Sequence, residues 1–287
     1  MDTNSLRTFI TTAELESFSL AAEQLYLTQP AISKRIAALE EELGAKLFDR
    51  IGRHVSLTEA GRTLLQRARI ILQEVEDSRR LISNLSGTVS GRLSIGTSHH
   101  IGLHRLPPVL RRYSADYPEV ELDLHFMDSE AACRAVLAGG LELGIVTLPP
   151  DPLAGLHSES IWHDPLAIVV GLDHPLAKQT RLALEQLADY PAILPAQGTY
   201  TRELLEQAFA PRDVKLKTGM TTNYLETIKM MVAVGLGWSV LPHTMLGEEL
   251  VALDIKGISL SRELGVVSHQ ARSLSNAARM MIATLRA

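Results

Sequence analysis

Polar side chains suited to DNA lie close together between residues 29 and 35. Gln29 carries an amide and Ser33 a hydroxyl, and on a helix this spacing would place them on one face. Gln29 could pair with an adenine edge and Ser33 with either kind of base edge, while Lys34 and Arg35 suit phosphates. This set predicts a helix that enters the major groove of DNA.

The same segment also has the pattern of a helix packed on a core. Thr28 is a good N-cap, and Pro30 fits the first turn, where a missing N–H is tolerated. An apolar face follows at i, i+4, i+7 and i+11, formed by Ile32, Ile36, Leu39 and Leu43. The polar face is therefore free to bind a partner.

A second basic group follows this helix. Gly52 predicts a turn between two short extended segments, which would form a small wing. Arg50, Arg53 and His54 would lie at its tip, where they could contact the DNA backbone or the minor groove.

Net charge does not by itself favour DNA. The chain carries 28 Lys and Arg against 33 Asp and Glu, a net charge of -5, so any DNA-binding surface must be local. Residues 1–58 hold six basic and eight acidic side chains. On spacing alone, a small helical unit that binds protein is the alternative.

Two shorter helices are predicted before the polar helix. The first has an apolar face formed by Leu6, Phe9, Ile10 and Ala13. Ser19 is a good N-cap for the second, which carries Ala21, Ala22 and Leu25. Short helices with tight links predict one compact unit.

A long helix of roughly 28 residues, about 42 Å, is predicted from Thr58 to about Ser86. Residues at two positions of a seven-residue repeat follow one another at 3-4-3-4 spacing along this helix, and most of them are apolar. They are Gly61, Leu64, Ala68, Ile71, Val75, Ser78, Ile82 and Leu85. Such a seam favours dimerisation; the alternative is a single helix packed on its own domain.

Strands and helices alternate beyond a predicted hinge at residues 87–91. Strands are indicated by Leu93–Thr97, Val120–Phe126, Leu143–Thr147 and Ala167–Val170, and helices by residues of about 103–116, 128–139 and 199–210. The alternation predicts an α/β domain with a largely parallel sheet.

These motifs identify the chain as similar to LysR-type transcriptional regulators. The resemblance is carried in the first 61 residues by Phe18-Ser-Leu-Ala-Ala-Glu-Gln-Leu, Leu27-Thr-Gln-Pro-Ala-Ile-Ser, Leu39-Glu-Glu-Glu-Leu-Gly, Leu47-Phe-Asp-Arg and Leu57-Thr-Glu-Ala-Gly. It extends more loosely through Gly140-Leu-Glu-Leu-Gly-Ile-Val, His174-Pro-Leu-Ala and Val234-Gly-Leu-Gly-Trp-Ser-Val-Leu-Pro.

The resemblance implies an α plus α/β protein in three parts: a winged helix-turn-helix at 1–58, a dimerising linker helix at 59–87, and an effector domain at 88–287 that is built like a periplasmic binding protein. It implies DNA contacts by Thr28, Gln29, Pro30, Ser33 and Lys34, with Arg50 and Arg53 from the wing. It also implies homodimers or homotetramers on a split inverted-repeat site in double-stranded DNA, and allows contact with RNA polymerase.

A small-molecule effector is expected between two lobes, about 91–161 with 268–287 and about 162–267. Polar residues at strand ends are the candidates, and their hydroxyl and amide groups suit a small organic acid. Ser98, Thr147 and Thr199 match family ligand positions, and the others are His99, His100, Gln197, Tyr200 and Asn223. The two histidines could instead pack the lobes. The segments contain no arginine before Arg202, which disfavours a multiply charged ligand.

Other chemistry is not expected. His99, His100 and His104 have no carboxylate or thiol beside them in the sequence, so neither a metal nor another cofactor is predicted. Cys133 is the only cysteine, which excludes an internal disulfide. An enzyme or solute-binding protein is the rival class, but the sequence has no P-loop, Gly-x-Ser-x-Gly or His-Glu-x-x-His motif. With no secretory signal and no membrane-length apolar run, a cytoplasmic location is expected.

Overall fold

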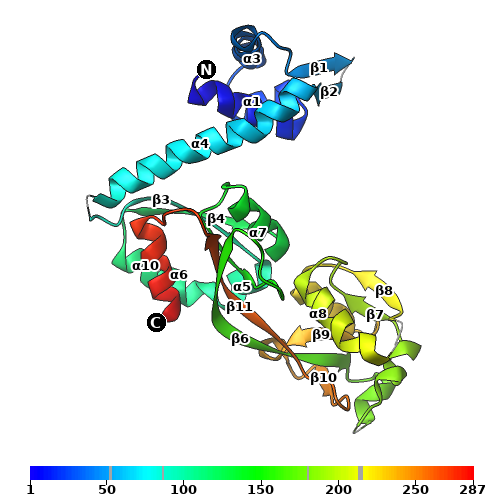
Figure 1. The fold of residues 1–287 in the computed structure, drawn as a ribbon. Helices are drawn as coiled ribbons and strands as arrows, with labels where there is room; N and C mark the ends of the chain where they lie inside the picture. Colours follow the sequence, from blue (N-terminus) through cyan, green and yellow to red (C-terminus); the bar gives the residue numbers. More distant parts are fainter. Residues whose placement is uncertain (52–53, 86, 180, 213–215) are drawn as a thin grey trace. The chain divides into compact units, whose positions relative to one another are not determined.

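The computed structural model describes residues 1–51, 54–85, 87–179, 181–212 and 216–287. The chain divides into two compact units, Met1–Ser86 and Gly87–Ala287 (Figure 1). Each unit has its own apolar core. No helix within the described ranges is both long and apolar enough to cross a membrane.

The first unit begins with the predicted short helices, α1 (Thr3–Leu15), α2 (Phe18–Gln24) and α3 (Gln29–Leu43). Thr28 caps α3 as predicted, accepting from the Ala31 N–H at 3.4 Å. The predicted cap Ser19 is wrong, because α2 begins at Phe18 and Ser17 caps it. Ser17 Oγ accepts from the Leu20 N–H at 3.3 Å, and Phe18, the first residue of the helix, is buried with its ring 5.5 Å from that of Phe48 between centroids.

The predicted wing is a hairpin. Strands β1 (Phe48–Ile51) and β2 (His54–Leu57) pair antiparallel, with Arg50 opposite Val55. The side chain of Arg50 and the whole of Gly52 and Arg53 lie outside the described residues. Their expected DNA contacts therefore stay predictions.

The long helix is α4 (Glu59–Leu85), in agreement with the sequence pattern. Its predicted seam has two different environments. Ala68 is buried and Leu64 is partly buried in the core of the first unit, and an added Cβ at Gly61 would collide with the carbonyl oxygen of Leu47. Further along, Ile82 is 70% and Leu85 is 87% exposed. Only the second part of the seam is free to meet a partner.

The second unit is built on a mixed sheet in the order β10-β6-β11-β5-β3-β4, with β9 pairing β6. The strands are β3 (Gly91–Thr97), β4 (Val120–Phe126), β5 (Leu143–Thr147), β6 (Leu156–Gly171), β9 (Ser239–Pro242), β10 (Leu250–Leu253) and β11 (Leu260–His269). Strand β3 runs parallel to β4 and β5, whereas β6 and β11 pair antiparallel with each other. The prediction of a largely parallel sheet is therefore wrong outside β4-β3-β5. A separate parallel pair joins β7 (Ala192–Leu194) to β8 (Thr218–Thr221).

Helices pack against this framework in two groups. One core, around Leu93, Tyr113 and Met281, lies under α5 (His99–His104), α6 (Leu106–Asp116) and α10 (Asn276–Arg286), next to α7 (Ser129–Leu137). Other cores, around Trp238 and around Ile228, lie under α8 (Tyr200–Phe209) and α9 (Leu225–Ala233). We call these groups the first and second lobes. Short 3₁₀ turns η1 (Pro175–Lys178), η2 (Leu184–Asp189), η3 (Ala210–Arg212) and η4 (His243–Met245) complete the second lobe.

Strands β6 and β11 run through both lobes. Trp162 of β6 and Leu264 of β11 pack on the first lobe, whereas Leu166 and Leu260 pack on the second. The pairing register shifts between Leu264 and Gly265, within the part of the pair that packs on the first lobe. The two lobes therefore share one pair of long strands.

Candidate functional site

The polar face of α3 is exposed. Thr28, Gln29, Pro30 and Lys34 are all open to solvent, and Ser33 is half-buried. The amide group of Gln29 on this surface is already ordered, since its Nε2 donates to Ser33 Oγ at 2.9 Å. Amide, hydroxyl and ammonium groups are therefore presented together on one face of a capped helix.

Arg35 has a different environment from Lys34. Its Nη1 donates to Thr8 Oγ1 at 3.1 Å, and Thr8 Oγ1 donates in turn to the carbonyl oxygen of Asn4 at 2.7 Å. This chain of hydrogen bonds joins α3 to α1. A phosphate contact by Arg35 stays a prediction, and the structure gives the residue a role in positioning α3.

Glu40 also positions α3, which the sequence reasoning did not find. The carboxylate is 8% exposed and accepts from the Leu47 N–H at 2.9 Å, the Phe48 N–H at 3.4 Å and Lys46 Nζ at 2.7 Å. Although burial opposes ionisation, the hydrogen bonds from Lys46 and from these two backbone groups lower the pKa of Glu40. The end of α3 is thereby attached to the start of the wing.

In the second unit, the N-terminal ends of α5, α7, α8 and α9 surround a cavity of about 60 Å³. Its walls are formed by Ser98, His99, His100, Asp128, Ser129, Glu130, Thr147, Pro195, Thr199, Thr201, Asn223, Leu225 and Arg262. Six predicted effector residues are among them: Ser98, His99, His100, Thr147, Thr199 and Asn223. The strand-end rule therefore brought these residues to one place, whereas Gln197 and Tyr200 do not line the cavity.

Tyr200 is turned away from the cavity for a packing reason. Its side chain packs against the first-lobe core that contains Cys133, and burial raises the pKa of its phenol above the ordinary value. Its backbone N–H donates to Glu130 Oε1 at 2.6 Å. A carboxylate of α7 therefore occupies the first N–H of α8, where an anionic ligand would otherwise be favoured. Gln197 is exposed in the turn before α8.

Arg262 is the cation that the sequence reasoning missed. It lies in β11, is 8% exposed, and donates from Nε to Asp164 Oδ2 at 2.9 Å and from Nη1 to Thr201 Oγ1 at 2.7 Å. Arg105 Nη2 approaches the other oxygen of Asp164 at 3.3 Å. Two guanidinium groups share one carboxylate, so this side of the cavity keeps a net positive charge. The strand-end segments gave no signal for it, because Arg262 lies within a strand.

Two carboxylates also line the cavity. Asp128 Oδ2 accepts from Asn223 Nδ2 at 2.8 Å, and Glu130 lies in the first turn of α7. Burial raises the pKa of Glu130 despite its hydrogen bond from the Tyr200 N–H. The cavity lining therefore combines one buried guanidinium group with carboxylate hydrogen-bond acceptors. Asp128, Ser129 and Glu130 follow β4 closely, so a strand-end search extended past Phe126 would have found them.

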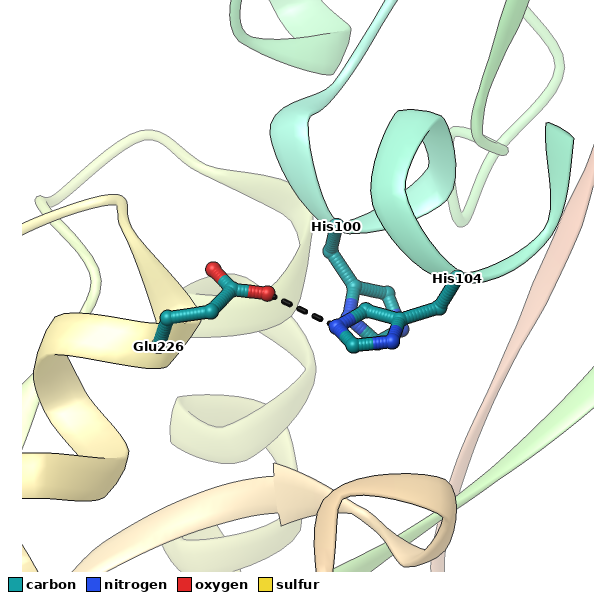
Figure 2. A group of neighbouring side chains, drawn as sticks. All are labelled: His100, His104 and Glu226. Atoms are coloured by element: carbon teal, nitrogen blue, oxygen red, sulfur yellow. Dashed lines mark hydrogen bonds and ion pairs between the residues drawn. The ribbon is translucent and has the colours of Figure 1, made fainter. Parts of the chain in front are cut away.

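The expectation that no carboxylate stands beside the histidines is wrong, because the fold brings Glu226 next to His104. His104 Nε2 lies 2.9 Å from Oε1 of Glu226 in α9, and the ring of His100 is 4.9 Å from that of His104 (Figure 2). The ring of His99 contacts Tyr224 at 4.8 Å between centroids. Glu226 is 122 residues from His104, so no local pattern could have paired them.

Both units match known protein-family models. Residues 3–62 match the bacterial regulatory helix-turn-helix protein of the lysR family, and residues 86–287 match the LysR substrate binding domain.

Individual proteins give the same result. The chain is 66% identical over 108 residues to an uncharacterised HTH-type transcriptional regulator of Azotobacter vinelandii, a match that covers 38% of this chain and 75% of that protein. It is 31% identical to the RuBisCO operon transcriptional regulator of Allochromatium vinosum over 95% of this chain and 91% of that one. The crystal structure of full-length CbnR with its target DNA has a TM-score of 0.67 and 22% identity, covering 100% of this chain and 99% of CbnR.

Proposed function

Because this chain belongs to the LysR family of bacterial transcriptional regulators, we propose that it binds a split inverted-repeat DNA site as a dimer or tetramer and responds to a small organic acid. It is a regulator with an effector-binding domain, not an enzyme. We also propose that the protein acts in the cytoplasm, where the bacterial chromosome lies. Contact with RNA polymerase is a further part of the proposed function.

The DNA side of the proposal is supported by the exposed face of α3. Thr28, Gln29, Pro30, Ser33 and Lys34 lie on the first turns of the helix, where a recognition helix contacts base edges and phosphates. Arg50 and Arg53 of the wing would add contacts to the DNA backbone or minor groove.

Pairing of two such helices would use α4. The apolar side chains at its second half, including Leu81, Ile82 and Leu85, are between 51% and 87% exposed in the single chain. A second copy of the same helix would cover them by coiled-coil packing. A twofold arrangement of α4 would then present two α3 helices to two half-sites of an inverted repeat.

The observation that carries the effector proposal is the cavity at the ends of α5, α7, α8 and α9. Arg262 and the hydroxyls of Ser98, Thr199 and Thr201 suit a carboxylate. The carboxylates of Asp128 and Glu130, which also line the cavity, suit a hydroxyl or ammonium group that donates to them. We therefore propose an acid that also carries a donor, such as a hydroxy acid or an amino acid, rather than a simple dicarboxylate.

Ligand binding would act on the two lobes together. The cavity walls come from both lobes, and the lobes are connected across it by Glu130 with Tyr200 and by Asp128 with Asn223. An acid that displaces or strengthens these contacts would shift the equilibrium between lobe arrangements by its difference in affinity for them. The altered effector domains would then change the spacing of the paired recognition helices.

The test begins with a thermal-shift screen of small hydroxy, amino and simple carboxylic acids on the full chain, because a ligand that binds the folded state raises the unfolding midpoint. For an acid that binds, Ser98→Ala or Thr199→Ala should weaken its affinity about 10-fold, the value of one hydrogen bond to a charged group. DNA affinity without effector should stay at the wild-type value.

Ser158→Ala, an exposed serine of β6 outside the cavity walls, is the matched control and should change neither affinity. Equal loss of effector and DNA affinity in Ser98→Ala would contradict the proposal. So would an acid whose affinity is unaffected by both cavity variants.

A further inference from the structure

Three side chains with metal-ligating atoms meet between the two lobes. His100 and His104 lie one turn apart on α5 of the first lobe, and Glu226 lies on α9 of the second. One ring nitrogen of each histidine and one carboxylate oxygen of Glu226 all lie within 4.8 Å of one another. Figure 2 shows the two rings side by side on one helix, with the carboxylate of Glu226 directed at them.

His100 is the unusual member of this cluster. It is 4% exposed, and neither Nδ1 nor Nε2 has a hydrogen-bond partner among the described residues. Buried polar groups are normally hydrogen-bonded, so an imidazole with two unsatisfied nitrogens indicates a missing partner. Arg262, the cation whose charge acts on this ring, donates to Asp164 and Thr201 instead, so it does not supply that partner.

The ring of His100 is chemically suited to fill this gap. An imidazole binds a metal ion through a ring nitrogen that carries a lone pair, and both nitrogens of the buried His100 ring lack a hydrogen bond within the described part of the chain.

We propose that His100, His104 and Glu226 bind a divalent transition metal ion of the zinc class, which joins the first lobe to the second. Two imidazoles and one carboxylate are a ligand set that Zn²⁺ takes with a fourth position left for water or another ligand. Hard ions such as Ca²⁺ and Mg²⁺ prefer oxygen ligands and are disfavoured by two ring nitrogens.

The geometry requires only small side-chain movements. Ligand atoms at Zn–N and Zn–O distances of about 2.0–2.1 Å in a tetrahedral site are about 3.4 Å apart. His104 Nε2 and Glu226 Oε1, now 2.9 Å apart, would separate slightly, and the ring of His100 would move towards them. His104 and Glu226 are 40% and 38% exposed, so they have room to move and an ion can reach them from solvent.

This site is distinct from the carboxylate-binding groups of the cavity but adjoins them. His100 also lines the cavity, whereas His104 and Glu226 do not. An ion held there would add positive charge beside the cavity and would tie α5 to α9. Metal binding itself does not depend on the proposed effector.

The test is titration of metal-free full-length protein with Zn²⁺ in calorimetry, with Co²⁺ as a spectroscopic substitute. We expect one saturable ion per chain, visible Co²⁺ bands typical of a four-coordinate site, and a raised unfolding midpoint. Changes to groups that merely support a metal ligand weaken binding about 10–100-fold, so Glu226→Gln and His104→Gln should each weaken Zn²⁺ binding at least about 100-fold.

His125→Gln is the matched control. His125 Nε2 lies 2.9 Å from Asp123 Oδ2, the same distance as in the His104–Glu226 pair, and the pair is exposed. His125→Gln should leave the high-affinity Zn²⁺ site unchanged. Glu226→Gln keeps the proposal testable even where a change at buried His100 impairs folding, because Glu226 is partly exposed.

Two results would overturn the proposal. One is the absence of saturable Zn²⁺ binding at one ion per chain in the wild-type protein. The other is a Zn²⁺ affinity in folded Glu226→Gln and His104→Gln equal to that of the wild type, since binding would then belong to other histidines. Neither result bears on whether an organic acid binds the cavity, which is measured separately in metal-free buffer.

Discussion

Lys34 and Arg35 are adjacent cations with different surroundings. Lys34 is exposed on the polar face of α3, whereas Arg35 is hydrogen-bonded to Thr8 of α1. At the residue scale, the two should therefore affect DNA binding in different ways, one through phosphate charge and the other through the position of the helix.

Lys34→Ala should weaken DNA binding and reduce the slope of log affinity against log salt by about 1, the contribution of one phosphate contact. The measurement is fluorescence anisotropy with a labelled duplex over a series of salt concentrations. Lys178→Ala, an exposed lysine of the second unit, is the control and should leave the slope unchanged. An unchanged slope in Lys34→Ala would exclude it as a phosphate contact.

Glu40 should make the stability of the first unit depend on pH. Its carboxylate accepts hydrogen bonds from Lys46 and from the start of β1, so Glu40→Gln should lower the free energy of unfolding by about 2 kcal/mol at pH 7. Its folded-state pKa is lowered, so this stabilisation is fully present above the unfolded value of about 4.5. It is lost as the pH falls through the folded pKa.

The measurement for Glu40 is urea unfolding of wild type and Glu40→Gln at pH 7 and at acid pH. The difference between the two proteins should shrink in acid. Glu41→Gln, at an exposed neighbouring position, should be close to wild type at both. A difference that stays constant across this range would show that ionised Glu40 does not stabilise the fold.

At the scale of elements, the two halves of α4 have different environments. Its first half is part of the core of the first unit through Leu64 and Ala68, and its second half exposes Ile82 and Leu85. Burying such side chains contributes about 1.5–3 kcal/mol each, enough to drive association when two copies supply them together. The helix that completes the first unit therefore also carries the exposed apolar side chains that the proposed dimer would bury.

The double change Ile82→Glu and Leu85→Glu should raise the dimer dissociation constant at least about 100-fold, because two buried apolar contacts are replaced by charges. Analytical ultracentrifugation over a concentration series measures this directly. Gln66→Glu is the control, because it adds a charge at an exposed position on the first half of α4, away from Ile82 and Leu85. It should leave the dimer dissociation constant unchanged. A double variant that dimerises like the wild type would place the interface elsewhere.

At the scale of the whole molecule, the two units have separate cores. Each should therefore unfold in its own transition, and a ligand should stabilise only the unit that binds it. Calorimetry of the full chain should resolve two transitions, one for residues 1–86 and one for 87–287. An acid bound in the cavity at 100 times its dissociation constant should stabilise the second unit by about 2.7 kcal/mol and raise only that transition.

Glu40→Gln identifies the other transition, since it should lower the transition of the first unit alone. A single transition that shifts as a whole with either change would show that the units unfold cooperatively, and that their separate cores do not make them independent.

Much of the first unit is determined by sequence alone. Thr28, Pro30 and the apolar positions of α3 act within a few residues, so capping and helical periodicity predict the helix without knowledge of its neighbours. At Ser19 the same rule offers two serines two residues apart, and the structure uses Ser17, which leaves Phe18 as the first, buried residue of α2. The two family-model matches confirm the resemblance that these local motifs carry.

Tertiary structure alone decided which distant groups meet. The strand-end rule found Ser98 and Thr147, because polar residues at the ends of the parallel strands β3 and β5 converge at one edge of the sheet, and Thr199, which follows β7 in the second lobe, joins them at the cavity. Arg262 reaches Asp164 across 98 residues of sequence, and Glu226 reaches His104 across 122. Such pairs depend on the pairing of β6 with β11 and on the packing of one lobe against the other. Side-chain periodicity carries no information about either, because it records only which face of an element is buried.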